Sequence, residues 1–134
     1  DGLPADRPRY LMGVGDPASL VEAIALGVDM FDCVLPTRLA RHGTLLTDAG
    51  RLNLRNARFA RDGDPLDAGC ACPTCARHSR GYLRHLLVTG ELTAMTLLSV
   101  HNVAWLLRLV DRTRDAVAAG TLAAWRRDVL AVWG

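Results

Sequence analysis

The sequence lacks lysine altogether, and all 16 of its basic residues are arginines. Codon bias alone can explain this composition, although arginine is also the better donor for bidentate phosphate contacts. Fourteen acidic residues nearly balance the arginines, and the net charge of +2 is too small to establish nucleic-acid binding. Aromatic residues make up only 5% of the chain, but the hydrophobic content of 50% is ample for a core.

Long apolar runs and targeting signals are also missing. No run approaches the roughly 20 apolar residues of a membrane span, and no signal peptide opens the chain. These absences predict a cytoplasmic protein without a membrane span. The first residue is Asp1 and not Met, so we expect an N-terminal part of the protein to precede these 134 residues. The length fits one domain or part of a larger one.

Three of the four cysteines lie within six residues, at Cys70, Cys72 and Cys75. Thiolates at this spacing can converge on one ion, and Zn²⁺ is the usual choice because sulfur and imidazole suit its tetrahedral geometry. The alternative is a disulfide with one free thiol, which an odd number of clustered cysteines argues against. We therefore predict a structural zinc site. Three sulfurs leave one position open, for which spacing alone does not choose among His78, His85 and His101.

The first third of the chain predicts a strand, a helix and a second strand. Residues 9–15 form the first strand and its glycine turn, and a helix runs from the N-cap Asp16 to Gly27. Residues 28–35 form the second strand, which we expect to stop at Pro36. This is a βαβ unit with parallel strands. Because a parallel sheet needs further strands and covered faces, the unit is a slice of an α/β fold.

The remaining segments are mostly helical. Alternating hydrophobic residues around a Thr-Asp-Ala-Gly turn predict a hairpin, and the later apolar stripes have helical spacing. A break near Ser99 is expected in the longest helix. The predicted elements are a β-hairpin at 43–46 and 51–54, helices at 80–88 and 92–119, and a last short helix from Thr121.

Asp32 is the most informative single residue. By alternation it shares a strand face with Met30 and Val34, so the pattern predicts a carboxylate in an apolar, inward-looking row. It lies near the C-terminal end of the strand, where parallel α/β folds place their chemistry. Burying a carboxylate is costly unless it is paired or functional. The alternatives are an aspartate bonded to the turn after Leu35 or paired with a following arginine.

Two further pairs of residues are candidates for a functional site near this strand. Arg38 and Arg41, three residues apart, suit phosphate binding, although a solvated loop is the alternative. Tyr10 and Met12 can sandwich a planar ring, and core packing explains them equally well. We interpret Cys33 as a core thiol and not as a nucleophile.

Taken together, three motifs resemble the tRNA-guanine transglycosylases, also called queuine tRNA-ribosyltransferases. They are YLMGVG at 10–15, GVDMFDCVLPTR at 27–38, and Cys-x-Cys-x2-Cys followed by a distant His-Asn. The resemblance implies His101 as the fourth zinc ligand. It also implies an α/β fold, the C-terminal portion of a (β/α)₈ TIM barrel with a zinc-binding insertion that contains a β-hairpin and helices. The implied parts are the last two βα units at 1–41, the insertion at 42–101 and the closing helices at 102–134.

The resemblance further implies roles for the flanking residues. Asp32 is the implied nucleophile, which attacks a ribose C1′ in the tRNA anticodon loop and expels guanine. An incoming 7-deazaguanine, a queuine precursor, then takes the ribose from the covalent intermediate. The implied substrate-binding residues are Tyr10, Met12 and Gly13, and the implied RNA-binding residues are Arg38 and Arg41.

The sequence departs from the family pattern at one position and lacks one of the family's functional residues. Leu39 stands where many bacterial members have Asn, and the second aspartate of the family lies upstream of Asp1. We therefore expect the 134 residues alone to be inactive. A homodimer is implied, with Tyr82 and His85 at positions used in its interface. The alternative function is a stand-alone zinc-stabilised RNA-binding or dimerisation module without catalysis.

Overall fold

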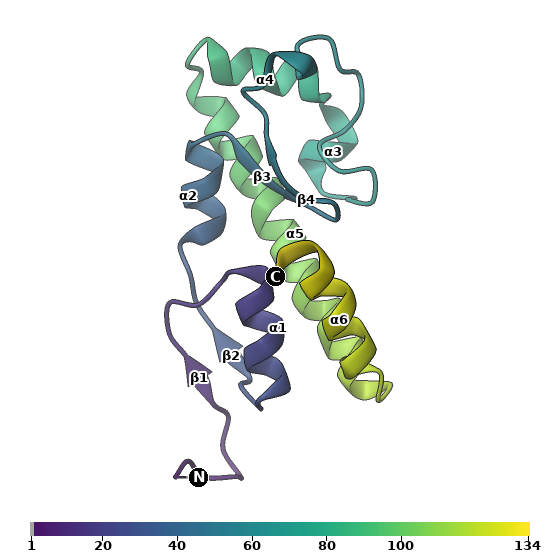
Figure 1. The fold of residues 1–134 in the computed structure, drawn as a ribbon. Coiled ribbons are helices and arrows are strands. Elements are labelled where there is room, and N and C mark those ends of the chain that lie inside the picture. The colour runs from purple at the N-terminus through teal and green to yellow at the C-terminus, as the bar shows by residue number, and fades with distance from the viewer. Residues whose placement is uncertain (1) are drawn as a thin grey trace. The chain divides into compact units, whose positions relative to one another are not determined.

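The computed structural model describes residues 2–134 and contains six α-helices, two short sheets and one 3₁₀ helix in that range (Figure 1). The chain divides into two compact units. The first comprises the residues up to Leu35 together with Leu109–Gly134, and the second is Pro36–Arg108. The division cuts one helix, α5 (Leu92–Ala118), which contributes to both units.

The first unit contains the predicted βαβ arrangement. Strand β1 (Tyr10–Leu11) pairs in parallel with β2 (Met30–Phe31), and α1 (Pro17–Ala25) connects them. The side chain of Asp16 accepts a hydrogen bond from the backbone N–H of Ser19 at 3.4 Å, as expected for an N-cap. Helix α6 (Leu122–Trp133) packs against α1. The parallel pairing predicted from the sequence is therefore confirmed.

The strands are shorter and more exposed than the sequence pattern predicts. Met30 is 48% exposed and Val34 is 58% exposed, so the row that includes Asp32 is open to solvent. The prediction of an inward-looking row is wrong for the described part of the chain. The physical reason is that a strand face becomes inward-looking only when a second layer covers it.

The second unit is built around a hairpin. Strands β3 (Thr44–Thr47) and β4 (Gly50–Asn53) pair antiparallel, which confirms the predicted hairpin. The 3₁₀ helix η1 (Ala57–Phe59) follows, and α4 (Arg80–Val88) spans the predicted helical residues. These elements share a core with the first part of α5, which includes Leu45, Leu54, Phe59, Leu66, Leu83, Leu87 and Leu98.

Two short helices were not predicted. Helix α2 (Leu35–Arg41) begins where the sequence pattern placed a stop at Pro36, and α3 (Pro73–Arg77) begins within the cysteine motif. In both, proline lies in the first turn, where its missing N–H costs nothing. Gly43 ends α2 with φ +77°, and a Cβ there would lie 2.5 Å from a methyl group of Leu87. The close approach requires glycine at this turn.

Helix α5 runs without the break expected near Ser99. By length and composition it is apolar enough to cross a membrane, the one such helix among residues 2–134. Its buried residues recur at helical spacing and include the polar His101, Asn102 and Thr113. Buried residues at this spacing form the stripe with which an amphipathic helix packs on a protein core.

Candidate metal centre and active-site strand

Three cysteines and one histidine form a buried cluster in the second unit. Cys70 and Cys72 come from the loop before α3, Cys75 from α3 itself, and His101 from α5. The ligand atoms of all four lie within 4.8 Å of one another. The imidazole Nδ1 is 3.2 Å from the Cys75 Sγ and 3.7 Å from the Cys72 Sγ. The group can hold a metal ion, and His78 is not among the clustered residues.

The local sequence explains how the thiols converge. Cys72 is the N-cap of α3, and its sulfur accepts from the Cys75 N–H at 3.5 Å. Pro73 starts the helix directly after this cap, so the two sulfurs lie on the same side of one turn. Upstream, the Cys70 N–H donates to the Asp67 carbonyl at 3.1 Å, which turns the chain into the cluster.

A backbone carbonyl fixes the orientation of the imidazole. His101 is fully buried, and its Nε2 lies 2.9 Å from the carbonyl oxygen of Leu46 on β3. Because a carbonyl only accepts, Nε2 must carry the proton, which leaves the Nδ1 lone pair directed at the thiols. A metal-binding histidine normally has its second nitrogen held in this way.

Burial controls protonation at the cluster. It raises the pKa of the Cys70 thiol and raises the pKa of the Cys75 thiol to about 12. Burial also lowers the pKa of His101, which keeps the imidazole neutral. Three sulfurs and one neutral imidazole are the ligand set that tetrahedral zinc prefers, and a cation favours the thiolate form that burial opposes.

An arginine on α5 braces the loop that carries Cys70. The Arg108 guanidinium donates to the Asp67 carboxylate at 2.8 Å, to the Asp48 carboxylate at 3.1 Å and to the carbonyl of Gly69. Trp105 Nε1–H also donates to Asp48, at 2.9 Å. The network therefore ties the hairpin turn, the cysteine loop and α5 together. Sequence reasoning missed it, although the spacing of seven residues from His101 to Arg108 places both on one helix face.

The candidate nucleophile lies in the first unit. Two donors converge on Oδ1 of Asp32: the Tyr10 hydroxyl at 2.7 Å and the Gly13 N–H at 3.0 Å. These bonds, the Tyr10 bond foremost, lower the pKa of Asp32, so its exposed carboxylate is ionised at neutral pH. The same bond to the carboxylate raises the pKa of Tyr10. The structure thus brings together three of the residues singled out from the sequence.

The other predicted site residues lie nearby in the sequence. Met12 is 73% exposed and Gly13 has φ +73°, so the turn presents both a side chain and bare backbone to solvent. Arg38 and Arg41 lie on the exposed side of α2 in the second unit. The alternative of a solvated loop is therefore wrong, because both residues are helical. Asn102 belongs to the His-Asn motif, and the sequence does not predict its hydrogen bonds.

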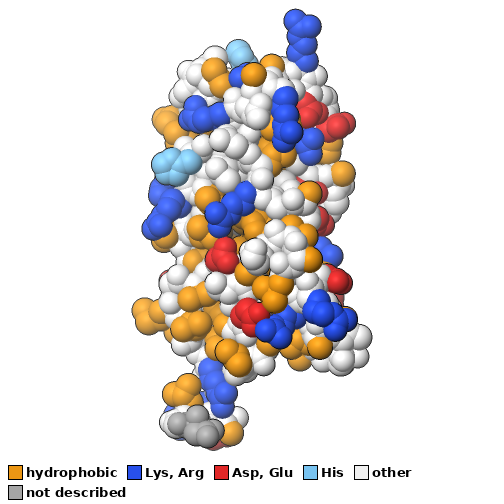
Figure 2. All heavy atoms as spheres, viewed as in Figure 1, with side chains coloured by type: hydrophobic (Ala, Val, Ile, Leu, Met, Phe, Trp, Pro, Cys, Tyr) orange, Lys and Arg blue, Asp and Glu red, His pale blue; other side chains and the backbone are white. Residues whose placement is uncertain are grey.

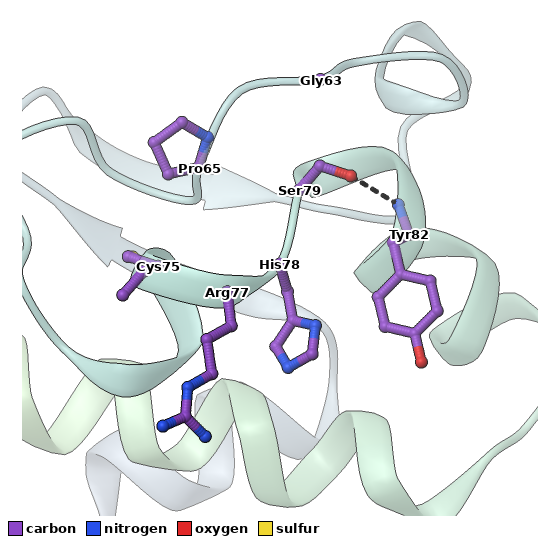
Figure 3. Close-up of a pocket in the computed structure, with 8 residues that line it drawn as sticks. Gly63, Pro65, Cys75, Arg77, His78, Ser79 and Tyr82 are labelled. Carbon is purple, nitrogen blue, oxygen red and sulfur yellow. Dashed lines mark hydrogen bonds between the residues drawn. The ribbon is translucent and has the colours of Figure 1, made fainter.

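A surface pocket adjoins the metal cluster. Its lining includes Arg77, His78, Ser79 and Tyr82 (Figure 3). The His78 and Tyr82 rings stack with centroids 5.3 Å apart, and the Ser79 hydroxyl caps α4 by accepting from the Tyr82 N–H at 3.3 Å. Tyr82 is exposed on α4, and His78 is half-buried at the end of α3, so the stacked rings line the pocket from two helices.

Comparison with known proteins assigns the family. A family model described as queuine tRNA-ribosyltransferase matches residues 1–134. Curated relatives of that name occur in Symbiobacterium thermophilum, 54% identical over 131 residues, and in Sphingopyxis alaskensis, 56% identical over 129 residues. The alignments cover 98% and 96% of this chain but 33% and 34% of those relatives, so the chain spans about a third of their length. The chain belongs to the queuine tRNA-ribosyltransferase family.

Proposed function

We propose that the chain is the C-terminal part of a tRNA-guanine transglycosylase, which exchanges guanine for a 7-deazaguanine in the tRNA anticodon loop. The observation that carries the proposal is the state of Asp32. It is exposed and ionised, it is held by two donors on one oxygen, and it directly follows a parallel β-strand. A carboxylate prepared in this way is suited to nucleophilic attack on a sugar carbon.

The proposed chemistry is a double displacement. One carboxylate oxygen of Asp32 bonds to the ribose C1′ as the bond from C1′ to guanine N9 breaks, and the electron pair leaves with the base. A proton from the rest of the enzyme neutralises the departing guanine. The incoming 7-deazaguanine then loses its N9 proton and displaces the carboxylate, so configuration is retained as in a retaining glycosidase. The Tyr10 hydroxyl and Gly13 N–H hold Oδ1 during both steps.

The turn after β1 is the proposed base-binding site. Met12 offers an exposed, polarizable thioether on which a planar base can lie. Gly13 lacks a Cβ, so its backbone can approach the base edge closely. Tyr10 adds an aromatic face beside Asp32, to which its hydroxyl is bonded. Two of these residues, Tyr10 and Gly13, bond to the carboxylate that would react.

The proposed RNA contacts are individual arginines. Arg38 and Arg41 are exposed on α2, six and nine residues after the nucleophile. On the face seen in Figure 2, arginine side chains lie scattered between apolar and uncharged surface and do not form one large basic patch. Affinity for phosphates would then depend on a few well-placed guanidinium groups.

The remaining features complete the proposal. Cys70, Cys72, Cys75 and His101 would hold a structural Zn²⁺, which supplies folding energy and no reaction step. The proposed parts are the last two βα units of the TIM barrel at 1–41, the zinc-binding insertion at 42–101 and the closing helices at 102–134. We also propose a cytoplasmic homodimer without a membrane span. Tyr82 and His85, both exposed on α4, are the proposed interface residues.

Replacement of Asp32 tests the function. In the longer protein, Asp32→Asn keeps the shape of the site but removes the attacking charge. We expect loss of the covalent RNA adduct on denaturing electrophoresis and a fall of several orders of magnitude in guanine exchange, with tRNA still bound.

The control is Arg38→Gln, which should weaken binding and lower its salt dependence while the adduct still forms. An adduct with the Asn variant would identify another nucleophile. An unmodified protein that binds tRNA without any adduct or exchange would favour the RNA-binding module instead.

A further inference from the structure

The side chain of Asn102 is fully buried and uses its carboxamide at both ends. Its Oδ1 accepts from the Leu46 N–H at 3.0 Å, and its Nδ2 donates to the carbonyls of Pro36 and Thr44, each at 3.0 Å. Carbonyls only accept and the N–H only donates, so the orientation of the carboxamide is unambiguous. One side chain therefore joins α5 to strand β3 and to the first turn of α2.

The attachment matters because α2 is short. A helix of seven residues has little stability of its own, so its placement depends on tertiary contacts. Pro36 and Ala40 form its buried side, four residues apart, while Arg38 and Arg41 are exposed. The bond from Asn102 to the Pro36 carbonyl fixes the first turn, and with it the direction of the exposed side.

We propose that Asn102 is a positioning residue for RNA binding, because it holds α2 in the rotation that presents Arg38 and Arg41 to the phosphate backbone. The inference rests on the proposed function of those two arginines. A guanidinium group binds phosphate through two parallel hydrogen bonds, and this geometry is lost when its helix turns or frays.

Leu46 of β3, which bonds to Asn102, also bonds to the proposed zinc ligand His101. His101 donates to the Leu46 carbonyl, and Asn102 accepts from the Leu46 N–H. Two consecutive residues of α5 thus hold both backbone groups of a single strand residue. The anchor of α2 and the orientation of the proposed zinc ligand are consequently set by one piece of backbone.

The test is a double-mutant cycle in the longer protein that contains this chain. Binding of an anticodon stem-loop RNA is measured over a range of salt concentrations for Asn102→Ser, Arg38→Gln with Arg41→Gln, and the combination. We expect Asn102→Ser to weaken binding by about tenfold and to lower the salt slope by about 1 to 2, as for loss of one or two phosphate contacts. In the variant that already lacks Arg38 and Arg41, Asn102→Ser should have little further effect on binding or on the salt slope.

A matched control separates positioning from general destabilisation. Thr74 is fully buried on α3, and its hydroxyl donates to the Leu97 carbonyl at 2.8 Å, a bond that joins α3 to α5 and not to α2. Thr74→Val should lower thermal stability without changing the salt slope. Equal slope changes for Thr74→Val and Asn102→Ser would overturn the inference, as would an Asn102 effect that persists in full without the arginines. Unchanged RNA binding in the arginine double variant would instead refute their proposed role, and the inference with it.

One further measurement does not depend on whether a variant folds. In the unmodified protein, hydrogen exchange should show the backbone amides at 40–43 opening together with those of Leu46 and Leu54. A separate and much faster opening of α2 would overturn the inference.

Discussion

The two sheets of this chain have equal numbers of strands but opposite surroundings. In the hairpin of the second unit, Leu45 and Leu46 are fully buried, whereas in the parallel pair of the first unit Tyr10 is 51% exposed. A hairpin finds its partner a few residues along the chain and here is covered by the core of its own unit. A parallel pair needs a crossover and layers on both faces, which these residues do not supply by themselves.

The chemistry follows the same division. The second unit buries its reactive groups, and the Cys75 thiol has a pKa raised to about 12 by burial. The first unit leaves Asp32 in solvent, where two hydrogen bonds keep it ionised. Under the proposed function, the buried cluster serves structure and the exposed carboxylate serves the reaction.

Metal removal should have the largest effect. Structural zinc contributes apparent binding energies of about 10–16 kcal/mol in small zinc modules, far more than any single contact described above. We expect chelation to unfold 36–108 while α1 and α6 keep their helical structure. Circular dichroism, hydrogen exchange and metal analysis would measure this. Retained protection throughout the second unit after complete metal loss would contradict the prediction.

Two histidine variants sharpen that result. His101→Ala removes a ligand and should reproduce the effect of chelation on the second unit. His78→Ala removes a ring that lies outside the cluster and stacks on Tyr82, so metal content should stay unchanged. Metal loss from the His78 variant, measured by metal analysis after gel filtration, would show that the ligand assignment is wrong.

Leucine truncations compare the two sheets directly. Leu46→Ala in the buried hairpin should lower the free energy of unfolding by about 2–5 kcal/mol, because it leaves a cavity in a packed core. Leu11→Ala in the exposed pair should cost less than about 1 kcal/mol, because its side chain is already partly hydrated. Urea titrations of residues 1–134 would measure both. Equal costs would mean that the parallel pair is covered in solution.

Arginine replacements should give the smallest difference. Arg108→Gln leaves the nearly buried Asp67 without its ion pair, and we expect a loss of about 1–3 kcal/mol in unfolding free energy. Arg126→Gln breaks an exposed pair with Glu22 in the first unit and should cost at most about 0.5 kcal/mol. Thermal melts in low and high salt would separate them. A larger loss for Arg126→Gln would reverse the expected order.

Elements with a strong local signal could be predicted from the sequence. The cap at Asp16, the hairpin turn and the helix at 80–88 all depend on residues close together in the chain, and the structure contains them. The clustering of His101 with the cysteines was predicted too, through the family resemblance. These features depend on spacing, which a sequence records directly.

Features that depend on distant contacts could not be predicted in the same way. Helix α2 was missed because Pro36 indicates a strand end as readily as a first helical turn. The exposure of the Asp32 row was misjudged because alternation identifies the two faces of a strand but not the layer that covers either one. The hydrogen bonds of Asn102 join residues more than 50 positions apart, and no local sequence pattern indicates them.

The side chains of His101 and Asn102 are held in place by main-chain atoms. His101 is held by the carbonyl of Leu46, and Asn102 by backbone groups of Leu46, Thr44 and Pro36. An amino-acid substitution does not remove a backbone carbonyl. The residue types at the positions that supply these bonds can therefore change, as long as the strand keeps its register. During evolution the two α5 residues should therefore remain fixed while their partners vary. Proline at position 46 is the exception, because it alone would remove the N–H that Asn102 needs.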